Sequence, residues 1–276
     1  LLFFSNSLFS QISCSQLPNF DVTYNNQTVT NSVFLTDKKI RITGNVTFNS
    51  NVVLSGCKVL IDPGSVVTMK GVFYCKKSVT GSTTTVSGCQ SMWNSIVISS
   101  GALVKLLDCT ITDGEKGLVF ENGYNAAYSV MQRCTLDRNL TAITADGVSN
   151  FSFSQFEGNL IKSGLNPNLM LAPYTANSQL IGISVKNSSG TIGTAGNANR
   201  FTGLSSGIRA ISSTLSVNNC SFRYNLRPSY ASPNHPGAVN VNSGIGIESI
   251  ASYLQIAGSY SNNFSCIFER NRIDIY

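Results

Sequence analysis

The segment CTITDGEKGL, residues 109–118, returns 25 residues later as CTLDRNLTAI, residues 134–143. The shared frame is a Cys or small residue, a free position, a large apolar residue, two further positions and often an Asn. Weaker copies of the frame begin at Ser154, Asn199, Cys220 and Cys266. The steps between copies are therefore 25, 20, 45, 21 and 46 residues. A repeated step, with two steps about twice as long, indicates a solenoid of stacked repeats.

The composition narrows the fold class and the partners. Only 12% of the 276 residues are charged, the net charge is +6, and no stretch carries apolar residues at helical spacing. Short alternating segments between Gly, Ser and Asn favour an all-β protein. No Lys/Arg run is interleaved with aromatic residues, so we do not expect nucleic acid as a partner. No stretch that follows the N-terminus reaches the ~18 apolar residues of a membrane span.

Each repeat contains about three short strands with alternating apolar residues. One unit has Leu103–Leu107, then Cys109–Ile111, then Gly117–Phe120. Strands this short are stable only when they pair with the same strand of the next repeat. The sequence therefore predicts a parallel β-helix solenoid with about 20–25 residues and three short strands per turn, in which equivalent residues stack at ~4.8 Å.

Stacking predicts columns of equivalent residues. We expect one inward column to contain Cys109, Cys134, Ser154 and Cys220. We expect a second inward column to contain Ile111, Leu136, Phe156, Phe201, Phe222 and Phe268. Turn positions are expected at Asn139, Asn159, Asn225 and Asn271, because Asn tolerates a left-handed backbone and can bond to the next turn.

These columns, and the Gly-Ile pairs at Gly207 and Gly246, resemble right-handed parallel β-helix proteins, the architecture of the pectate lyases. The segments 61–71 and 89–118 also resemble large secreted or surface β-helix proteins of Bacteroidetes-type bacteria. The latter often carry a Cys-x-x-Met-Trp-x-x-Ile segment, which Cys89–Ile96 matches. The resemblance implies a right-handed β-helix at the cell exterior and says little about activity.

The regions of the chain are expected to differ in role. Residues 1–13 have the apolar-then-polar character of a signal-peptide remnant, although a short N-terminal strand is an alternative. Residues 14–40 are expected to be an irregular β segment or cap, and 41–276 the β-helix. Loop insertions are expected near 160–180 and 226–243, which would explain the long steps. The chain ends within a repeat, so we expect it to be a fragment of a longer protein.

The eight cysteines allow 105 complete disulfide pairings. Stacked Cys109, Cys134 and Cys220 are expected to stay as buried thiols, because parallel stacking holds their Cβ atoms wider apart than a disulfide needs. Cys75 and Cys89 bracket a Gly/Ser/Thr loop, and the sequence leaves open whether they form a disulfide. No Cys-x-x-Cys occurs and His235 is the only histidine, so we expect no metal bound through these residues.

Two carboxylates are the weak candidates for catalysis. Asp137 and Glu157 hold the same frame position in successive repeats, so they are predicted to stack on one outer face. Two carboxylates at ~5 Å can act as an acid/base pair or bind Ca²⁺. The alternative is a solvated surface, and we predict no other cofactor.

Two functions follow as hypotheses. The first is a non-catalytic structural or adhesive protein, secreted or at the cell surface, that contacts carbohydrate. The second is a polysaccharide lyase or glycoside hydrolase acting on an acidic polysaccharide. A fold by itself does not decide between them.

Overall fold

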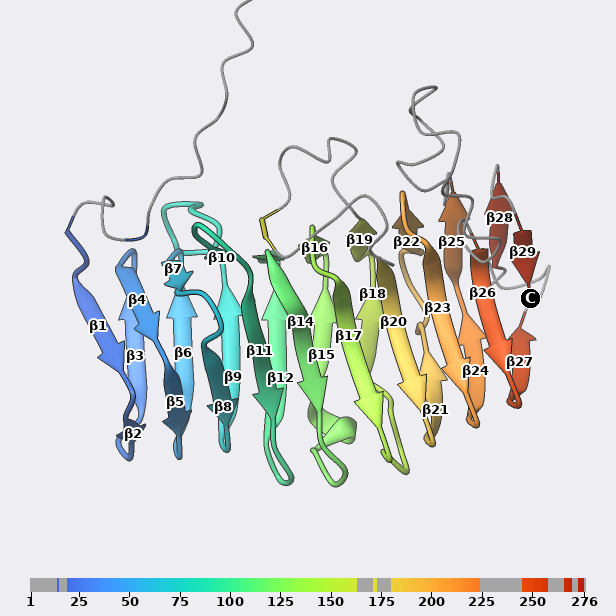
Figure 1. Cartoon of the computed structure of the whole chain (residues 1–276), viewed down its shortest axis with the longest axis horizontal. Coiled ribbons are helices and arrows are strands. Elements are labelled where there is room, and N and C mark those ends of the chain that lie inside the picture. Colours follow the sequence, from blue (N-terminus) through green and yellow to red (C-terminus); the bar gives the residue numbers. More distant parts are fainter. Residues whose placement is uncertain are drawn as a thin grey trace, which may run out of the picture.

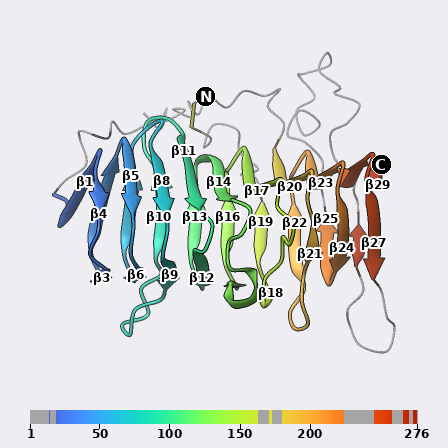
Figure 2. The ribbon, with the colours of Figure 1, turned by 90° about the horizontal axis from the view of Figure 1, so that it is seen from below.

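The computed structural model describes residue 14 and residues 19–162, 171–172, 180–223, 245–257, 266–269 and 273–275. All pairings between its named strands are parallel, and they form a solenoid in which the chain visits three faces in turn. The coils follow one another along the long axis, from the blue N-terminal end to the red C-terminal end (Figure 1). The view turned by 90° shows the same succession (Figure 2). The predicted all-β parallel β-helix is confirmed.

Faces 1 and 2 are ten-stranded sheets. Face 1 contains β1 (Val22–Asn25), β4 (Lys39–Thr43), β7 (Lys58–Ile61), β10 (Thr85–Gly88), β13 (Thr110–Thr112), β16 (Thr135–Asp137), β19 (Leu160–Lys162), β22 (Asn199–Thr202), β25 (Cys220–Arg223) and β28 (Ile267–Glu269). Face 2 contains β2 (Thr28–Val29), β5 (Asn45–Phe48), β8 (Val66–Met69), β11 (Trp93–Ile98), β14 (Gly114–Phe120), β17 (Thr141–Asp146), β20 (Ile181–Lys186), β23 (Ser206–Ile211), β26 (Ile245–Ile250) and β29 (Ile273–Ile275).

Face 3 contains a six-stranded and a three-stranded sheet, and an isolated bridge joins Phe151, which precedes the last strand of the first sheet, to Gly190 in the second sheet. The first has β3 (Val33–Thr36), β6 (Val52–Ser55), β9 (Val72–Lys76), β12 (Leu103–Leu107), β15 (Val130–Gln132) and β18 (Gln155–Glu157). The second has β21 (Ser189–Ile192), β24 (Thr214–Asn218) and β27 (Tyr253–Ala257). A short 3-10 helix, η2 (Ala126–Tyr128), precedes β15.

Coil length varies along the solenoid. Val22 pairs with Ile40, 18 residues later, whereas Ile111 pairs with Leu136, 25 residues later. Because β1, β2 and β3 already pair with the following coil, regular stacking begins at Val22. The expectation of an irregular segment over 14–40 was therefore wrong for most of that range. The early coils are shorter than the repeat period found near Cys109, which hid them from the sequence pattern.

The long coils have their extra residues at the same corner. β19 ends at Lys162 and β20 begins at Ile181, while β25 ends at Arg223 and β26 begins at Ile245. Both intervals join face 1 to face 2 and coincide with the insertions expected near 160–180 and 226–243. Most of their residues lie outside the described part of the chain, but Ala172 forms a bridge with Ser91.

Large apolar side chains fill the interior. The inward column of face 1 reads Ile40, Val59, Val86, Ile111, Leu136, Ile161, Phe201, Phe222 and Phe268 in register. Phe201 and Phe222 stack with ring centroids 4.8 Å apart. Burial of such a side chain stabilises the fold by about 1.5–3 kcal/mol.

Phe156 does not belong to this column. It lies in β18 on face 3 and pairs with Met131, and Ile161 takes the expected place beside Leu136. The Ser154 copy of the repeated phrase therefore falls on a different face. Both faces alternate apolar with polar residues, so local likeness alone did not distinguish them.

The corner between faces 3 and 1 has a column of small thiols and amides. Register places Cys109, Cys134, Asn159, Asn199 and Cys220 one above another, just before or at the start of the face 1 strands. All five are buried, and Asn159 occupies the place that was expected for Ser154. The Sγ atoms of Cys109 and Cys134 are 3.7 Å apart and both thiols are free.

Asn139 lies at a different corner, between faces 1 and 2. Its Oδ1 accepts a hydrogen bond from the Gly114 backbone N–H at 2.8 Å, and its Nδ2 donates to the Ile111 carbonyl at 3.1 Å. Asn225 and Asn271 lie outside the described residues. The turn asparagines thus serve two corners of the coil rather than one.

A disulfide joins Cys14 to Cys89, which follows β10 at the corner between faces 1 and 2. Cys75 is a free thiol in the core, so the alternative of a Cys75–Cys89 disulfide is excluded. Cys75 points inward from β9, whereas Cys89 lies beyond the end of a face 1 strand, so the two side chains serve different parts of the coil.

Glycines precede isoleucines on face 2 because successive coils approach closely there. A Cβ on Gly207 would lie 2.6 Å from the Gly246 carbonyl oxygen, and a Cβ on Gly182 would lie 2.3 Å from the Gly207 carbonyl oxygen. Only glycine fits this approach, which accounts for the recurring Gly-Ile pair.

Candidate functional site

The two candidate carboxylates do not stack. Asp137 lies in β16 on face 1 and pairs with Thr112 and Lys162. Glu157 lies in β18 on face 3 and pairs with Gln132. The predicted column of two carboxylates was therefore wrong, because Ser154–Asn159 contains the face 3 strand β18, and the next copy of β16 is β19.

Asp137 belongs instead to a charge cluster formed by Asp113, Asp137, Arg138 and Lys162. Lys162 Nζ lies 3.6 Å and Arg138 Nη1 3.9 Å from Asp137 Oδ2. Arg138 Nε also donates to Asp113 Oδ1 at 3.0 Å. The cluster has equal numbers of acidic and basic groups, so its charges offset one another.

Burial raises the pKa of Asp137, and the nearby charges of Lys162 and Arg138 oppose this effect. Asp137 Oδ1 is buried and makes no hydrogen bond, and the same is true of Thr112 Oγ1 in the neighbouring strand. A carboxyl group with a raised pKa keeps its proton to higher pH and can therefore act as a proton donor. Asp113 is less available, because it is almost fully buried and bonded to Arg138.

Glu157 has no acidic neighbour in register. Gln132 Nε2 donates to Glu157 Oε1 at 2.5 Å across face 3. An amide partner cannot exchange a proton with the carboxylate, so this contact holds the side chain in place without forming an acid/base pair.

A groove opens on the outer surface of face 1 in the first four coils. It has a volume of ≈ 310 Å³ and is lined by Phe20, Lys39, Lys58, Leu60, Thr85 and Ser87, among others. This volume is at the lower end of the ~300–1,000 Å³ typical of small-molecule sites. The groove combines an aromatic ring, an apolar floor, two hydroxyls and two ammonium groups.

The two lysines are direct neighbours. Lys39 pairs in register with Lys58, and both side chains are exposed. Like charges facing each other across adjacent strands are unfavourable. Within the part of the chain that the structure describes, neither Lys39 Nζ nor Lys58 Nζ forms an ion pair.

Arg41, two residues after Lys39, differs from the two lysines because it is paired with an acid. Arg41 Nε and Nη2 donate to the two oxygens of Asp62 at 3.0 and 2.8 Å, and Thr43 donates to the same carboxylate. This hydrogen bonding raises the pKa of Arg41. The Phe20 ring lies against Arg41, with 5.9 Å from the guanidinium carbon to the ring centroid, so Phe20 is held at the edge of the groove.

The groove was not predicted from the sequence. The signal was present, because KIRIT at 39–43 and KVLID at 58–62 share a Lys followed by alternating apolar residues. Their spacing of 19 residues differs from the 25-residue step of the repeated phrase. Only the register in the structure shows that the two lysines stack.

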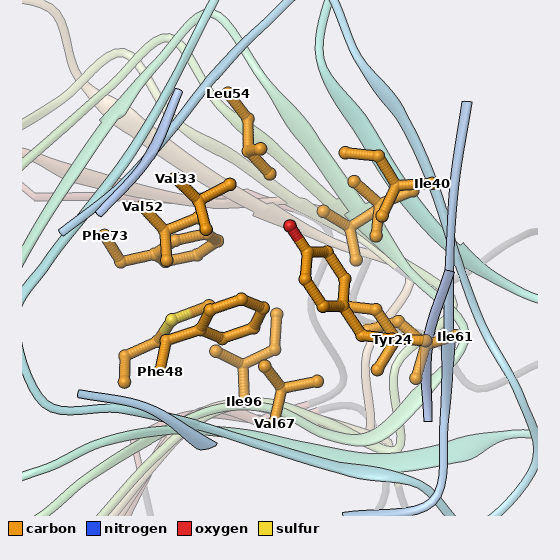
Figure 3. Close-up of a pocket in the computed structure, with 14 residues that line it drawn as sticks. Tyr24, Val33, Ile40, Phe48, Val52, Leu54, Ile61, Val67, Phe73 and Ile96 are labelled. Carbon is orange, nitrogen blue, oxygen red and sulfur yellow. The ribbon is translucent and has the colours of Figure 1, made fainter. Parts of the chain in front are cut away.

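A second, smaller space lies in the core of the first coils. This void is ≈ 20 Å³ and is lined by side chains such as Tyr24, Phe48 and Phe73 (Figure 3). Burial raises the pKa of Tyr24, whose hydroxyl points toward the space between the coil walls (Figure 3). A void this small with apolar walls is a packing defect and no ligand site.

One group of three potential metal ligands is present among the described residues. Ligand atoms of Cys14, Asp62 and Cys89 lie within 4.8 Å of one another, the single such group of three among the residues described. The two sulfurs are bonded to each other, so neither can supply a thiolate. The stacked carboxylates expected for Ca²⁺ are not assembled. His235 lies outside the described residues.

Within the described ranges, no helix has the length and apolar character needed to cross a membrane. No family model matches the chain, and neither the curated proteins nor the solved structures compared with it include a match.

Proposed function

We propose that this chain is a non-catalytic β-helix protein of the cell exterior that holds carbohydrate in the groove on face 1. The observation that carries the proposal is the groove itself, in which Phe20 borders an apolar floor at Leu60 and hydroxyls of Thr85 and Ser87. Sugar rings present apolar C–H faces and polar edges, so a site for them needs both kinds of surface.

The rigidity of the coil supports a binding role. The groove is built on strands β4, β7 and β10, whose backbones are fixed by pairing on both sides. A preorganised surface binds with a smaller loss of conformational entropy than a loop does. A stack of coils also places the site on an elongated body, as a structural or adhesive protein requires.

An exterior location is supported by the Cys14–Cys89 disulfide, since disulfides form and persist in oxidising compartments. The likeness of Cys89–Ile96 to surface β-helix proteins of Bacteroidetes-type bacteria points the same way. In the structure Trp93 of this segment is buried, and its Nε1 donates to the Thr112 carbonyl at 2.9 Å. The segment thus has a structural role at the corner next to the disulfide.

Calorimetric titration with short oligosaccharides, neutral and acidic, tests the proposal. We expect at least one class to bind, and Phe20→Ala to weaken that binding by about two- to tenfold through loss of the ring contact. Phe34→Ala is the matched control, because this ring is 68% exposed on face 3, away from the groove. Absence of binding to every oligosaccharide, or equal effects of the two variants, would overturn the proposal.

A second candidate function is cleavage of an acidic polysaccharide. The observation that favours it is Asp137, whose pKa is raised by burial and whose Oδ1 has no hydrogen bond, beside Lys162. An acid of this kind can protonate a leaving group while a cation binds the substrate's carboxylate.

Incubation with uronic and neutral polysaccharides, with and without Ca²⁺, separates the two functions. Under the binding proposal no unsaturated or reducing ends are released. Release of ends that is lost in Asp137→Asn, but kept in Asp108→Asn, would replace the binding proposal with the catalytic one. Asp108 suits the control because it is an ion-paired acid at another corner of the coil.

A further inference from the structure

We propose that the ligand of the face 1 groove is an acidic saccharide, with its anionic group placed between Lys39 and Lys58 and its ring against Phe20. This inference rests on the proposed carbohydrate-binding function and specifies the chemical class of the ligand. The anionic group is a carboxylate or a sulfate carried on the sugar.

The positive charges of Lys39 and Lys58, which have no acidic partner among the described residues, are the first argument for an anionic ligand. Lys39 and Lys58 are adjacent in register, so their backbones are separated by ~4.8 Å. An anion between the two ammonium groups turns their mutual repulsion into two attractive contacts. Ammonium groups bind such anions through charge-assisted hydrogen bonds.

The nearest acid of the same column is already engaged elsewhere. Asp21 precedes Val22, which pairs with Ile40, so it is the register neighbour of Lys39. Its Oδ2 accepts the Lys39 backbone N–H at 2.8 Å, and its Oδ1 lies 4.0 Å from Lys38 Nζ. Asp21 therefore does not pair with the Lys39 ammonium group, which remains available to a ligand in the groove.

Among the described side chains, no carboxylate forms an ion pair with either of these lysines. The segments outside the described residues contain no Asp or Glu. The neighbouring cation, Arg41, takes both oxygens of Asp62. The positive charge of the groove is therefore a property of the chain itself, in keeping with its net charge of +6.

The second step concerns the ring. Phe20 stands at the groove edge against Arg41, and Leu60 lies between Arg41 and Ser87 in the outward column. These apolar surfaces suit the C–H face of a sugar. Thr85, in register with Lys58, offers a hydroxyl that can donate to or accept from a ring substituent. An anion without a sugar ring would contact the two lysines but would not contact Phe20, Leu60 or the Thr85 hydroxyl.

Titration of the full chain with three oligosaccharides of similar length tests the inference: an oligogalacturonate, a sulfated oligosaccharide and a neutral one. We expect an acidic ligand to bind, with affinity that falls as salt is raised to about 0.5 M. Lys39→Gln/Lys58→Gln should weaken this binding by about tenfold or more. Comparison of the uronate and sulfate arms identifies which anion the groove prefers.

Lys105→Gln/Lys116→Gln is the matched control. It removes the same charge from exposed positions on faces 3 and 2, and should change affinity by less than about twofold. Thermal unfolding of both double variants checks that the fold is kept, as expected for exposed side chains.

The outcomes separate the two proposals. Neutral and acidic sugars that bind equally well, with no effect of the lysine changes, would overturn the acidic ligand and leave carbohydrate binding standing. Polyphosphate that binds as well as the acidic sugars, and equally to wild type and Phe20→Ala, would show recognition of charge alone and overturn the saccharide. No binding of any sugar would overturn both.

Discussion

Cys134 and Asn159 occupy the same corner position in successive coils, and the Cys134 backbone N–H donates to Asn159 Oδ1 at 3.0 Å. Asn159 Nδ2 in turn donates to the Met131 carbonyl and to Asn199 Oδ1, both at 2.9 Å. One amide thereby satisfies backbone groups of the coil before it and meets the side chain of the coil after it. Backbone hydrogen bonds also join the coils here, such as Thr135 N–H to the Cys109 carbonyl, but the Cys134 N–H and the Met131 carbonyl are bonded by the Asn159 side chain.

Asn159→Ala should lower the free energy of unfolding by about 3 kcal/mol or more, because it leaves a buried N–H and a buried carbonyl without partners. Urea unfolding followed by circular dichroism measures the loss. Asn150→Ala is the control, since Asn150 is exposed and only accepts from Ser152 Oγ. Similar losses for both variants would mean that the hydrogen bonds of the Asn159 side chain are not what stabilises this corner.

The Cys14–Cys89 disulfide links residues 75 positions apart. Its reduction should lower the free energy of unfolding by about 4 kcal/mol in the chain-entropy account. It should also weaken oligosaccharide binding, because Phe20 follows Cys14 closely in the chain and borders the groove. Unfolding and titration with and without reductant measure both effects.

A Cys14→Ser/Cys89→Ser variant is the control for the reductant and should not respond to it. Peptide mapping without reduction should recover the Cys14–Cys89 link. Recovery of a Cys75–Cys89 link would contradict the arrangement at this corner.

The contributions of Asp137 and Asp108 to the stability of the fold should change with pH in opposite directions. Burial raises the pKa of Asp137 in the fold, so its ionised form is unfavourable there, and its contribution to stability declines as pH rises through that pKa. The Arg133 guanidinium lowers the pKa of Asp108, so its contribution is present near neutral pH and is lost as pH falls through the lowered value.

Asp137→Asn should therefore be neutral or stabilising at pH 7, and Asp108→Asn slightly destabilising there. Both differences from wild type should begin to shrink near pH 3, because Asp137 and the unfolded-state aspartates take up protons in this range and Asp108 does so at lower pH. Thermal melts at the two pH values measure the four differences. A destabilised Asp137→Asn at neutral pH would show that Lys162 and Arg138 outweigh the burial of Asp137.

The Cys266 thiol should be alkylated near neutral pH, whereas the Cys220 thiol should not. A hydrogen bond from Cys220 lowers the pKa of Cys266 to about 7, and burial raises the pKa of Cys220 well above the usual thiol range. Alkylation of Cys266 should accelerate between about pH 6 and 8, with Cys220 protected throughout. Mass spectrometry of the alkylated peptides gives both rates. Cys220→Ser keeps a hydroxyl donor, so the pH midpoint of Cys266 alkylation should stay low. Cys220→Ala removes the donor and should raise this midpoint.

The repeat near Cys109 was sufficient to predict the architecture. Cys109 and Cys134, and Ile111 and Leu136, share a phrase because each pair occupies one column, and inward positions accept few residue types. The candidate site was less predictable. Ser154–Asn159 carries the same alternation, and period two is common to all three faces, so the phrase could not say that Phe156 and Glu157 belong to face 3.

The sequence by itself determined that short alternating strands must stack in parallel coils, because no single repeat can bury its own apolar side. Only the tertiary structure decided which outward residues meet. Lys39 and Lys58 became neighbours, and Asp137 and Glu157 did not, because coil length varies from 18 to 46 residues in the registers at Val22 and Phe222. Inward positions are constrained by packing in every coil, whereas outward positions acquire their neighbours from the register alone.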